Sequence, residues 1–268
     1  MAASQVNRIR QLLNEGKPTV ATRMESTWPT MIEAAASTGY FDYLEFVAEY
    51  APFNQSDLEN MCRAAELHDT AMTIKVDFQN RAYVMQKAFA SGFQGVLLTD
   101  HKTAAEIEES LYFMRADAPG ENGRFGYPNR RWVGYAPYIT QPEQVKRCQE
   151  LVVMVMIEKK EALDNIEEIC AIPGVDIVQF GPSDFSMTMG YAMRDHVDEV
   201  RAYEREMIKA ALKYGVRPRC EIPSFSAMQY YQDLGVKDFC IGDQLQNLMR
   251  SWADDAAKVC EAAKAMGK

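Results

Sequence analysis

The sequence predicts an α/β fold in which eight parallel strands and their helices form a (β/α)8 barrel. Eight apolar runs alternate with helical stretches along 268 residues, and a barrel of this kind takes about 250 residues as one domain. The runs at 152–157 and 175–180 are almost unbroken, as expected of parallel strands that are buried on both faces. A doubly wound open sheet is the alternative, although the usual nucleotide-binding glycine motifs are missing.

The first half of the chain contains four predicted strand–helix units, preceded by a short amphipathic helix at 5–15. Gly16 and Pro18 end that first helix. Strands are predicted at 19–25, 42–49, 71–76 and 95–99. Helices are predicted after them at 28–37, 54–67, 81–90 and 103–114. Asn54 or Ser56 is a suitable cap for the second of these helices.

The second half contains the other four units. Strands are predicted at 152–157, 175–180, 217–222 and 238–241. A polar helical stretch lies between Glu158 and Gly174, and further helices are predicted at 194–214, 226–234 and 244–266. Gly215 and Gly235 close two of these helices, as glycine commonly does just past a helix end.

The segment at 116–138 interrupts the alternation. It includes ADAPGENGRFG and YPNRRWVGYAPY and shows no helix or strand period. A loop of that length inside a compact domain is usually functional or disordered, and its aromatic residues and arginines argue against disorder. We expect a lid or a subunit contact, in a chain that otherwise forms a single domain over 1–268.

Composition argues against several classes of protein. The formal net charge is −9 and no basic stripe occurs, so nucleic acid is a poor candidate for a partner. No apolar run approaches the roughly 20 residues of a membrane span, and the N-terminus lacks the apolar stretch of a signal peptide. The six cysteines form no CxxC pair, so we expect reduced thiols in a cytoplasmic protein.

Ionisable side chains collect at the predicted carboxyl-terminal ends of the strands, which is the edge where barrels bind their ligands. Any one of them is explained equally well as a solvated loop start. Burying the whole set is costly unless its members pair or bind a metal. The set is Glu25, Glu49, Lys75, Asp77, Asp100, His101, Glu158, Asp184, Glu221 and Asp243.

Glu158 and Asp184 follow two consecutive strands, and of the carboxylates in the set they are the pair most clearly placed to bind a ligand together. Two hard oxygen ligands from neighbouring strands suit Mg²⁺, Mn²⁺ or a similar divalent ion. The alternative is that both form salt bridges with lysines or arginines nearby. In the turn GPSD, Gly181 allows a close approach of the backbone, and the amides of Ser183 and Asp184 are placed to hold a carboxylate.

The stretch MIEKKEALDNIEEICAIPGVDIVQFGPSDFSMTMGY, at 156–191, resembles the signature of the HpcH/HpaI aldolase and citrate lyase superfamily, the metal-dependent (class II) pyruvate aldolases. The resemblance implies a phosphoenolpyruvate/pyruvate-type (β/α)8 barrel in trimers or hexamers, with the last helix used in oligomer packing. It also implies a divalent ion (Mg, Mn or Co) held by Glu158 and Asp184, and a 2-oxoacid whose enolate that ion stabilises as a Lewis acid.

The chain departs from the family pattern at several positions. The family usually has DxEH after the second strand, whereas this chain has VAEY at 47–50, so that only Glu49 matches. Lys75 stands where the family has an arginine that clamps the substrate carboxylate, and it keeps the charge but loses the bidentate fork. Met156 replaces a glutamine, and Glu221 replaces an apolar residue.

Several residues are candidates to replace the missing Asp/His dyad. Tyr50 stands in the place of the histidine, and it is a base only if a cation such as Lys75 lowers its pKa from about 10. His101 titrates near neutrality unless its surroundings shift it, although a solvated loop histidine explains it equally well. Glu221 is a candidate base, third metal ligand or partner for a substrate amine.

We therefore expect a carbon–carbon lyase (EC 4.1.-.-) that acts, like an aldolase, on a 2-oxoacid or related small carboxylate. The second interpretation is a decarboxylase or Claisen-type condensing enzyme, because decarboxylation needs no base to remove a proton from a substrate hydroxyl. The third is a non-catalytic ligand-binding homologue. Catalytic roles are expected for Lys75, Tyr50, His101 and Glu49, and substrate-binding roles for Arg23, Gly181, Ser183 and Glu221, with Arg23 or Arg131 as the holder of a distal carboxylate.

Overall fold

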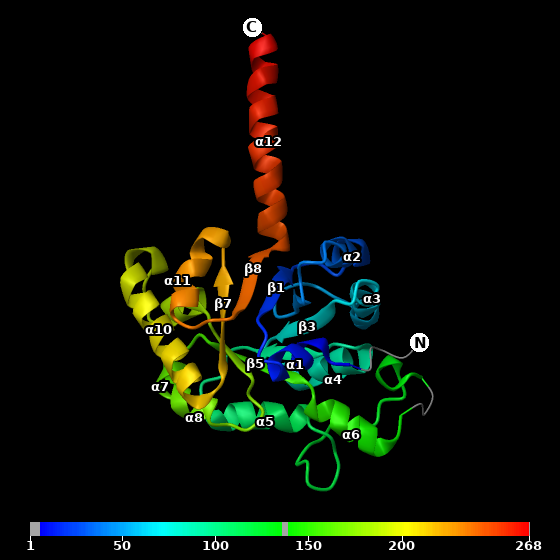
Figure 1. Ribbon diagram of the computed structural model, residues 1–268. Helices are drawn as coiled ribbons and strands as arrows, with labels where there is room; N and C mark the ends of the chain where they lie inside the picture. Colours follow the sequence, from blue (N-terminus) through cyan, green and yellow to red (C-terminus); the bar gives the residue numbers. More distant parts are fainter. Residues whose placement is uncertain (1–5, 136–138, 268) are drawn as a thin grey trace.

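Eight parallel strands close into a barrel, and each strand is hydrogen-bonded to its neighbours in chain order. The computed structural model in Figure 1 describes residues 6–135 and 139–267. The strands are β1 (Thr19–Met24), β2 (Tyr43–Val47), β3 (Ala71–Val76), β4 (Gly95–Leu98), β5 (Val152–Ile157), β6 (Ile177–Phe180), β7 (Arg217–Ile222) and β8 (Asp238–Asp243). The predicted (β/α)8 barrel is confirmed, and the doubly wound open sheet is wrong.

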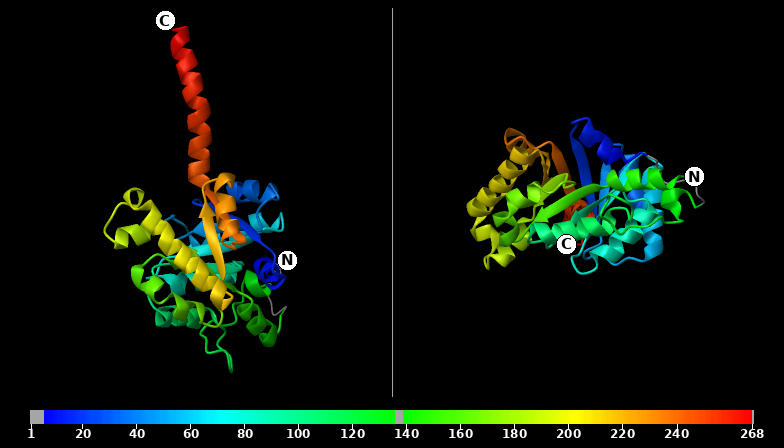
Figure 2. Two further views of the ribbon diagram at one scale, coloured as in Figure 1. Left: turned by 60° about the vertical axis from the view of Figure 1, so that its left-hand side comes forward. Right: turned by 90° about the horizontal axis from the view of Figure 1, so that it is seen from below.

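Helices surround the barrel, as Figures 1 and 2 show. The α-helices are α1 (Arg8–Asn14), α2 (Pro29–Ser37), α3 (Gln55–Glu66), α4 (Arg81–Ser91), α5 (Ala104–Met114), α6 (Gln141–Gln149), α7 (Lys160–Asp164), α8 (Ile166–Cys170), α9 (Pro182–Thr188), α10 (Val197–Tyr214), α11 (Met228–Asp233) and α12 (Gln244–Met266). Short 3₁₀ turns occur at η1 (Arg131–Val133), η2 (Met193–Asp195) and η3 (Phe225–Ala227).

Some boundaries differ from those expected. The polar stretch after β5 forms two short helices that meet at Asn165. The GPSD turn leads directly into α9, because Pro182 occupies the first helical position, where its missing N–H costs nothing. The expected helix start at Gln5 and residues 136–138 of the long segment lie outside the described residues.

The core has two parts, one inside the barrel and one between the barrel and its helices. Alternation along β2 shows the division, because Leu44 and Phe46 pack outward while Tyr43 packs inside. Ile9 of α1 joins the inner part and is fully buried. Side chains therefore fill the barrel, and ligands have access at its carboxyl-terminal end.

The long segment packs against helices. Arg130 pairs with Glu59 of α3 at 2.6 Å, and the indole of Trp132 donates to Gln144 of α6 at 2.7 Å. An isolated bridge joins Ala116 to Phe125. Whether 116–138 also forms a lid or a subunit contact stays a prediction.

α12 leaves the barrel after β8 and projects away from it, as Figure 1 and the left view of Figure 2 show. The Asp243 side chain caps it by accepting from the Gln246 N–H at 2.8 Å. Of its 23 residues only Gln244 is buried. In the part of the chain that the structure describes, no helix combines the length and apolar character needed to cross a membrane.

Candidate active site

The carboxyl-terminal ends of β2 to β5 bring three carboxylates together. Glu49 follows β2, Asp100 follows β4 and Glu158 follows β5, and one oxygen from each lies within 4.8 Å of the others. Parallel strands end at the same edge of a barrel, so residues that are far apart in sequence meet there. We call Glu49, Asp100 and Glu158 the carboxylate group.

Glu158 is the most deeply buried member of the group, at 1% exposed. Its Oε1 accepts the Asp100 N–H at 2.8 Å, while its Oε2 has no hydrogen-bond partner among the described residues. Burial raises the pKa of Glu158 to about 7, and the charges of Glu49 and Asp100 add to that rise. A buried oxygen without a partner, beside other carboxylates, fits a site for a cation.

Asp100 supplies a contact that the sequence analysis does not assign. Its backbone has φ +60°, a left-handed conformation that Asp tolerates better than most residues. This turn directs its N–H to Glu158, while its carboxylate lies 2.7 Å from the Lys159 ammonium. The only signal in the sequence is its place directly after the fourth strand.

Lys75 lies beside the carboxylate group on β3. Its Nζ is 2.5 Å from Oε2 of Glu49, and the residue is buried. Burial opposes the charged ammonium, but the carboxylates of Glu49 and Glu158 outweigh it and raise the pKa of Lys75. Lys75 therefore stays charged, and the structure brings it together with Glu49, which is also an expected catalytic residue.

Tyr50 does not acquire the lowered pKa that a base would require. The ring face lies near the Lys75 ammonium, 5.8 Å from its centroid. Desolvation and the adjacent carboxylate of Glu49 nevertheless raise the pKa of the Tyr50 hydroxyl above its ordinary value. The condition under which Tyr50 could act as a base, a pKa lowered by Lys75, is not met, because Glu49 already pairs with that lysine. A catalytic role for Tyr50 stays a prediction.

His101 lies between β4 and α5 and is fully buried. Its Nδ1 is 2.6 Å from the Thr99 carbonyl oxygen and its Nε2 is 2.6 Å from the Ser110 hydroxyl. Because a carbonyl can only accept, Nδ1 carries the proton. Burial lowers the pKa of His101 to about 4. Both ring nitrogens are engaged, so the structure gives His101 a packing role and leaves neither nitrogen for a substrate.

Gly181 allows β6 to approach Glu158 closely. A Cβ atom at this position would lie 2.7 Å from Cβ of Glu158 and 2.7 Å from Cε of Met156. Ser183 and Asp184 follow in the first turn of α9, with Ser183 exposed and Asp184 half-buried. Asp184 adds to the rise in the pKa of Lys159 that Asp100 and Glu158 mainly cause, so its charge lies at the same end of the barrel, although it is not a member of the carboxylate group.

The other side of the rim holds a separate ion-pair cluster. Arg23 of β1 lies 3.2 Å from Glu221 and 3.2 Å from Asp243. The Gln179 amide donates to the second oxygen of Glu221 at 2.7 Å. Arg23 is thus already matched by two carboxylates, which argues against its expected role with a distal carboxylate.

Arg131 is not at the strand ends. It is buried and forms a bidentate pair with Glu66 of α3, and it also donates to the Ser91 carbonyl oxygen at the end of α4. The structure therefore places Arg131 in the packing of the long segment, in contrast to its expected role as a substrate ligand.

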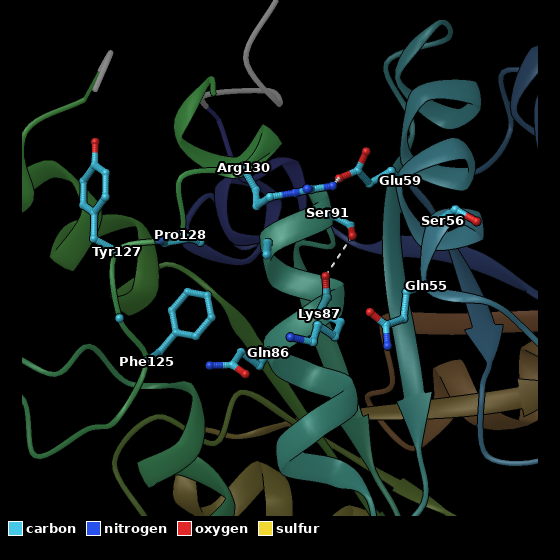
Figure 3. A pocket seen from close by; sticks show the side chains of 12 residues that line it. Gln55, Ser56, Glu59, Gln86, Lys87, Ser91, Phe125, Tyr127, Pro128 and Arg130 are labelled. Carbon is cyan, nitrogen blue, oxygen red and sulfur yellow. Dashed lines mark hydrogen bonds and ion pairs between the residues drawn. The ribbon is translucent and has the colours of Figure 1, made fainter. Parts of the chain in front are cut away.

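A cavity of about 520 Å³ lies between α3, α4 and the long segment, away from the carboxylate group (Figure 3). Arg130 and Glu59 form an ion pair at its edge, and the Phe125 ring faces it. It includes none of the expected catalytic, substrate-binding or metal-binding residues.

In sequence, the chain is similar to a family of aldolases and citrate lyases and to single proteins named as aldolases. The HpcH/HpaI aldolase/citrate lyase family model matches residues 24–218. A protein named 2-keto-3-deoxy-L-rhamnonate aldolase from Escherichia coli O17:K52:H18 is 29% identical over 193 residues, which cover 71% of this chain and 70% of that protein. The protein of the same name from Escherichia coli O157:H7 is 28% identical over the same shares of both chains.

Solved structures show the same fold. The HpcH/HpaI aldolase from Desulfitobacterium hafniense DCB-2 superimposes with a TM-score of 0.85 at 21% identity, covering 94% of this chain and 96% of that one. Citrate synthase SbnG gives a TM-score of 0.84 at 20% identity and covers 97% of this chain and 100% of its own. Macrophomate synthase gives 0.85 at 18% identity, with 97% and 91% covered.

Proposed function

Because the chain belongs to the HpcH/HpaI aldolase/citrate lyase family, it is a metal-dependent lyase of the aldolase type, and we propose that it cleaves a 2-oxoacid through an enolate. The observation that carries this proposal is Glu158, which is buried with one oxygen lacking a partner among the described residues. The charged Lys75 lies close enough to Glu158 to affect its pKa, so the site combines a cation-binding carboxylate with a fixed positive charge.

The chemistry of the donors fits a hard divalent ion. Glu158 and Asp184 are the proposed ligands, and Asp100 and Glu49 are the further oxygens that the carboxylate group offers. Carboxylate oxygens without nitrogen or sulfur donors favour Mg²⁺ or Mn²⁺, with Co²⁺ as a functional substitute. Such an ion supplies Lewis-acid stabilisation of the negative charge that an enolate carries.

The protein's own residues account for the remaining requirements of cleavage. The Glu49 carboxylate is proposed to take the proton from the C4 hydroxyl of a 4-hydroxy-2-oxoacid. The C3–C4 bond then breaks, the C4 fragment leaves as an aldehyde, and the bonding electrons pass to the enolate of the 2-oxoacid. Lys75 Nζ holds its positive charge near that enolate, and protonation at C3 completes the reaction.

Decarboxylation or Claisen-type condensation is the second candidate. The observation that favours it is the 2.5 Å ion pair between Lys75 and Glu49. A carboxylate held by an ammonium is a weaker base, and decarboxylation of oxaloacetate forms the same enolate without removing a hydroxyl proton. The two candidates share Glu158 and Lys75 and differ only in the need for Glu49 as a base.

The test measures pyruvate release from 4-hydroxy-2-oxoacids and from oxaloacetate, with Mn²⁺ or Mg²⁺ and then with a chelator. We expect chelation to abolish release, and Glu158→Gln and Lys75→Met each to lower kcat/KM by about a hundredfold. Lys209→Met, which removes an exposed lysine of α10, is the control and should stay within about twofold of the parent enzyme.

The outcomes separate the candidates. Release from hydroxy-oxoacids that is lost in Glu49→Gln supports aldol cleavage. Release from oxaloacetate alone, retained in Glu49→Gln, supports decarboxylation. Undiminished turnover by metal-free protein contradicts both.

We also propose a homo-oligomer located in the cytoplasm. The exposed apolar side chains of α12 support assembly, and a trimer or hexamer is the expected size. Free cysteines support a reducing compartment: five of the six are buried thiols and none of the six is in a disulfide. The proposed partner is a small 2-oxoacid or a related carboxylate.

A further inference from the structure

We propose that a cavity beside the carboxylate group is the subsite for the aldehyde half of the substrate, and that it selects a cationic group there over an anionic one. This inference rests on the proposed function, because it concerns the fragment that leaves or enters when the C3–C4 bond breaks or forms. It goes further by giving the chemical character of that fragment.

The cavity has a volume of about 560 Å³ and opens at the carboxyl-terminal ends of β2, β3 and β4. It shares Glu49 and Asp100 with the carboxylate group. The side chains that give it its character are Glu49, Tyr50, Phe53, Asp77, Tyr83 and Asp100. A substrate that reaches Glu158 with its 2-oxoacid end has this cavity directly available for its other end.

The lining is negatively charged. Its three carboxylates are those of Glu49, Asp77 and Asp100, and no lysine or arginine among the described residues lines the cavity. Lys75 balances Glu49 and Lys159 balances Asp100. The Asp77 carboxylate accepts only from the backbone and side chain of Asn80 among the described residues, at 2.9 and 2.8 Å, so its charge has no cation beside it.

Three aromatic rings line the same cavity. Phe53 is half-buried and its ring is held edge to face against Phe46, with centroids 5.7 Å apart. Tyr50 and Tyr83 are exposed to the cavity and the solvent. Ring faces attract cations, and rings combined with carboxylates are the usual means of holding an alkylammonium group.

The nearest lysines do not make the lining of this cavity positively charged. Lys75 lies over one face of Tyr50, and it is neutralised by Glu49. Lys87 lies 5.4 Å from the Tyr83 ring centroid, and it lines the cavity shown in Figure 3 on the outer side of α4. The charges of Glu49 and Asp100 are offset by Lys75, Lys159 and the proposed divalent ion. The charge that an anionic fragment meets on the lining is therefore that of Asp77, which has no lysine or arginine beside it among the described residues.

The experiment uses the condensation direction with pyruvate, Mn²⁺ and three small aldehydes of different charge. They are betaine aldehyde (cationic), glycolaldehyde (neutral) and glyoxylate (anionic). C3 of pyruvate loses a proton and forms a bond to the aldehyde carbon, the aldehyde oxygen takes a proton, and no oxidant or reductant is needed. We expect kcat/KM for betaine aldehyde to exceed that for glyoxylate by about tenfold or more.

Two variants show whether the cavity causes this preference. Asp77→Asn keeps the size of the side chain and removes its charge, and it should reduce the preference by about fivefold while glycolaldehyde changes less than about twofold. Asp117→Asn removes an exposed carboxylate of the long segment and should leave the preference unchanged. A glyoxylate rate equal to or above that of betaine aldehyde, or an unchanged preference in Asp77→Asn, overturns the inference.

Exchange of the C3 protons of pyruvate with deuterated water separates this inference from the proposed function. Exchange requires enolate formation but no aldehyde. If exchange occurs but glyoxylate is the preferred aldehyde, the subsite inference is overturned and the proposed enolate chemistry stands. Exchange that is absent in the metal-loaded enzyme refutes enolate chemistry with pyruvate, and the subsite inference falls with it.

Discussion

At the scale of single residues, Glu158 shows how the site is held in a state that suits a cation. A carboxylate at the end of a buried strand loses its hydration, and its pKa rises to about 7 because ionisation is unfavourable there. Gly181 permits this burial, since any side chain at that position would collide with Glu158. The cation-binding character of Glu158 therefore depends on a neighbouring strand as well as on the residue itself.

Metal-free protein should lose stability through Glu158 as the pH rises. The folded state binds the Glu158 proton more tightly than the unfolded state, so this group's contribution to the free energy of unfolding falls between pH 5 and pH 8 by roughly 2–3 kcal/mol. Urea unfolding with chelator present gives the free energy of unfolding of the parent protein and of Glu158→Gln. The change between pH 5 and pH 8 in the difference between these two free energies measures the contribution of Glu158.

The free energies of unfolding of the two proteins are compared because His101 gives both of them a pH dependence of the opposite sign, which cancels in the difference. Its pKa of about 4 in the folded state means that stability from His101 is lost as the pH falls below the ordinary value. Glu33→Gln, at an exposed glutamate of α2, is the matched control. A parent-to-Glu158→Gln difference that is the same at pH 5 and pH 8 contradicts the prediction.

At the scale of elements, α12 contacts its own barrel at its start, where the Gln244 side chain accepts from the backbone N–H groups of Glu25 and Ser26, and Gln244 is its only buried residue. Its apolar side chains recur at alternating spacings of four and three residues, which is the pattern of one apolar seam. The positions are Leu245, Met249, Trp252, Ala256, Val259, Ala263 and Met266. All of them are exposed, so the seam is available to another subunit.

Trp252→Glu should weaken the assembly without unfolding the barrel. Trp252 is 64% exposed within the single chain, so its replacement removes little packing there, but it places a charge within the seam. We expect a shift to smaller species in size-exclusion chromatography with light scattering. Arg250→Glu, outside the seam, is the control; equal mass for parent and Trp252→Glu contradicts the role of α12.

At the scale of the whole molecule, the barrel is held together inside by an ion pair across its axis. Arg219 of β7 and Glu45 of β2 lie 2.6 Å apart and both are fully buried. Tyr43 and Met154 pack around the guanidinium. One level nearer the rim, Gln179 and Glu221 continue the polar interior toward Arg23.

Removing one partner of this pair should be more damaging than removing both charges. Arg219→Met leaves Glu45 buried without its cation and should lower the free energy of unfolding by roughly 3–5 kcal/mol. The double variant Glu45→Gln with Arg219→Met should recover a large part of that loss. Urea unfolding of the three proteins measures it, and a double variant as unstable as the single one contradicts the argument.

The sequence alone determined the barrel, the eight strand positions and the edge at which the ionisable residues gather. It could do so because strand burial, turn residues and the GPSD stretch are local signals. Glu49, Lys75 and Glu158 could be placed at that edge for the same reason. Which of them touch could not be predicted, because contacts across the barrel depend on closure and register.

Tertiary structure decided the direction in which each side chain points. His101 turns toward α5, Arg131 pairs with α3, and Asp100 adopts a left-handed turn that binds Glu158. No local pattern distinguishes these arrangements from solvated loop residues, since each is set by partners far along the chain. The family and the fold are therefore properties of the sequence pattern, whereas the pairing of charges and the cavity beside them exist only once the strands have closed into the barrel.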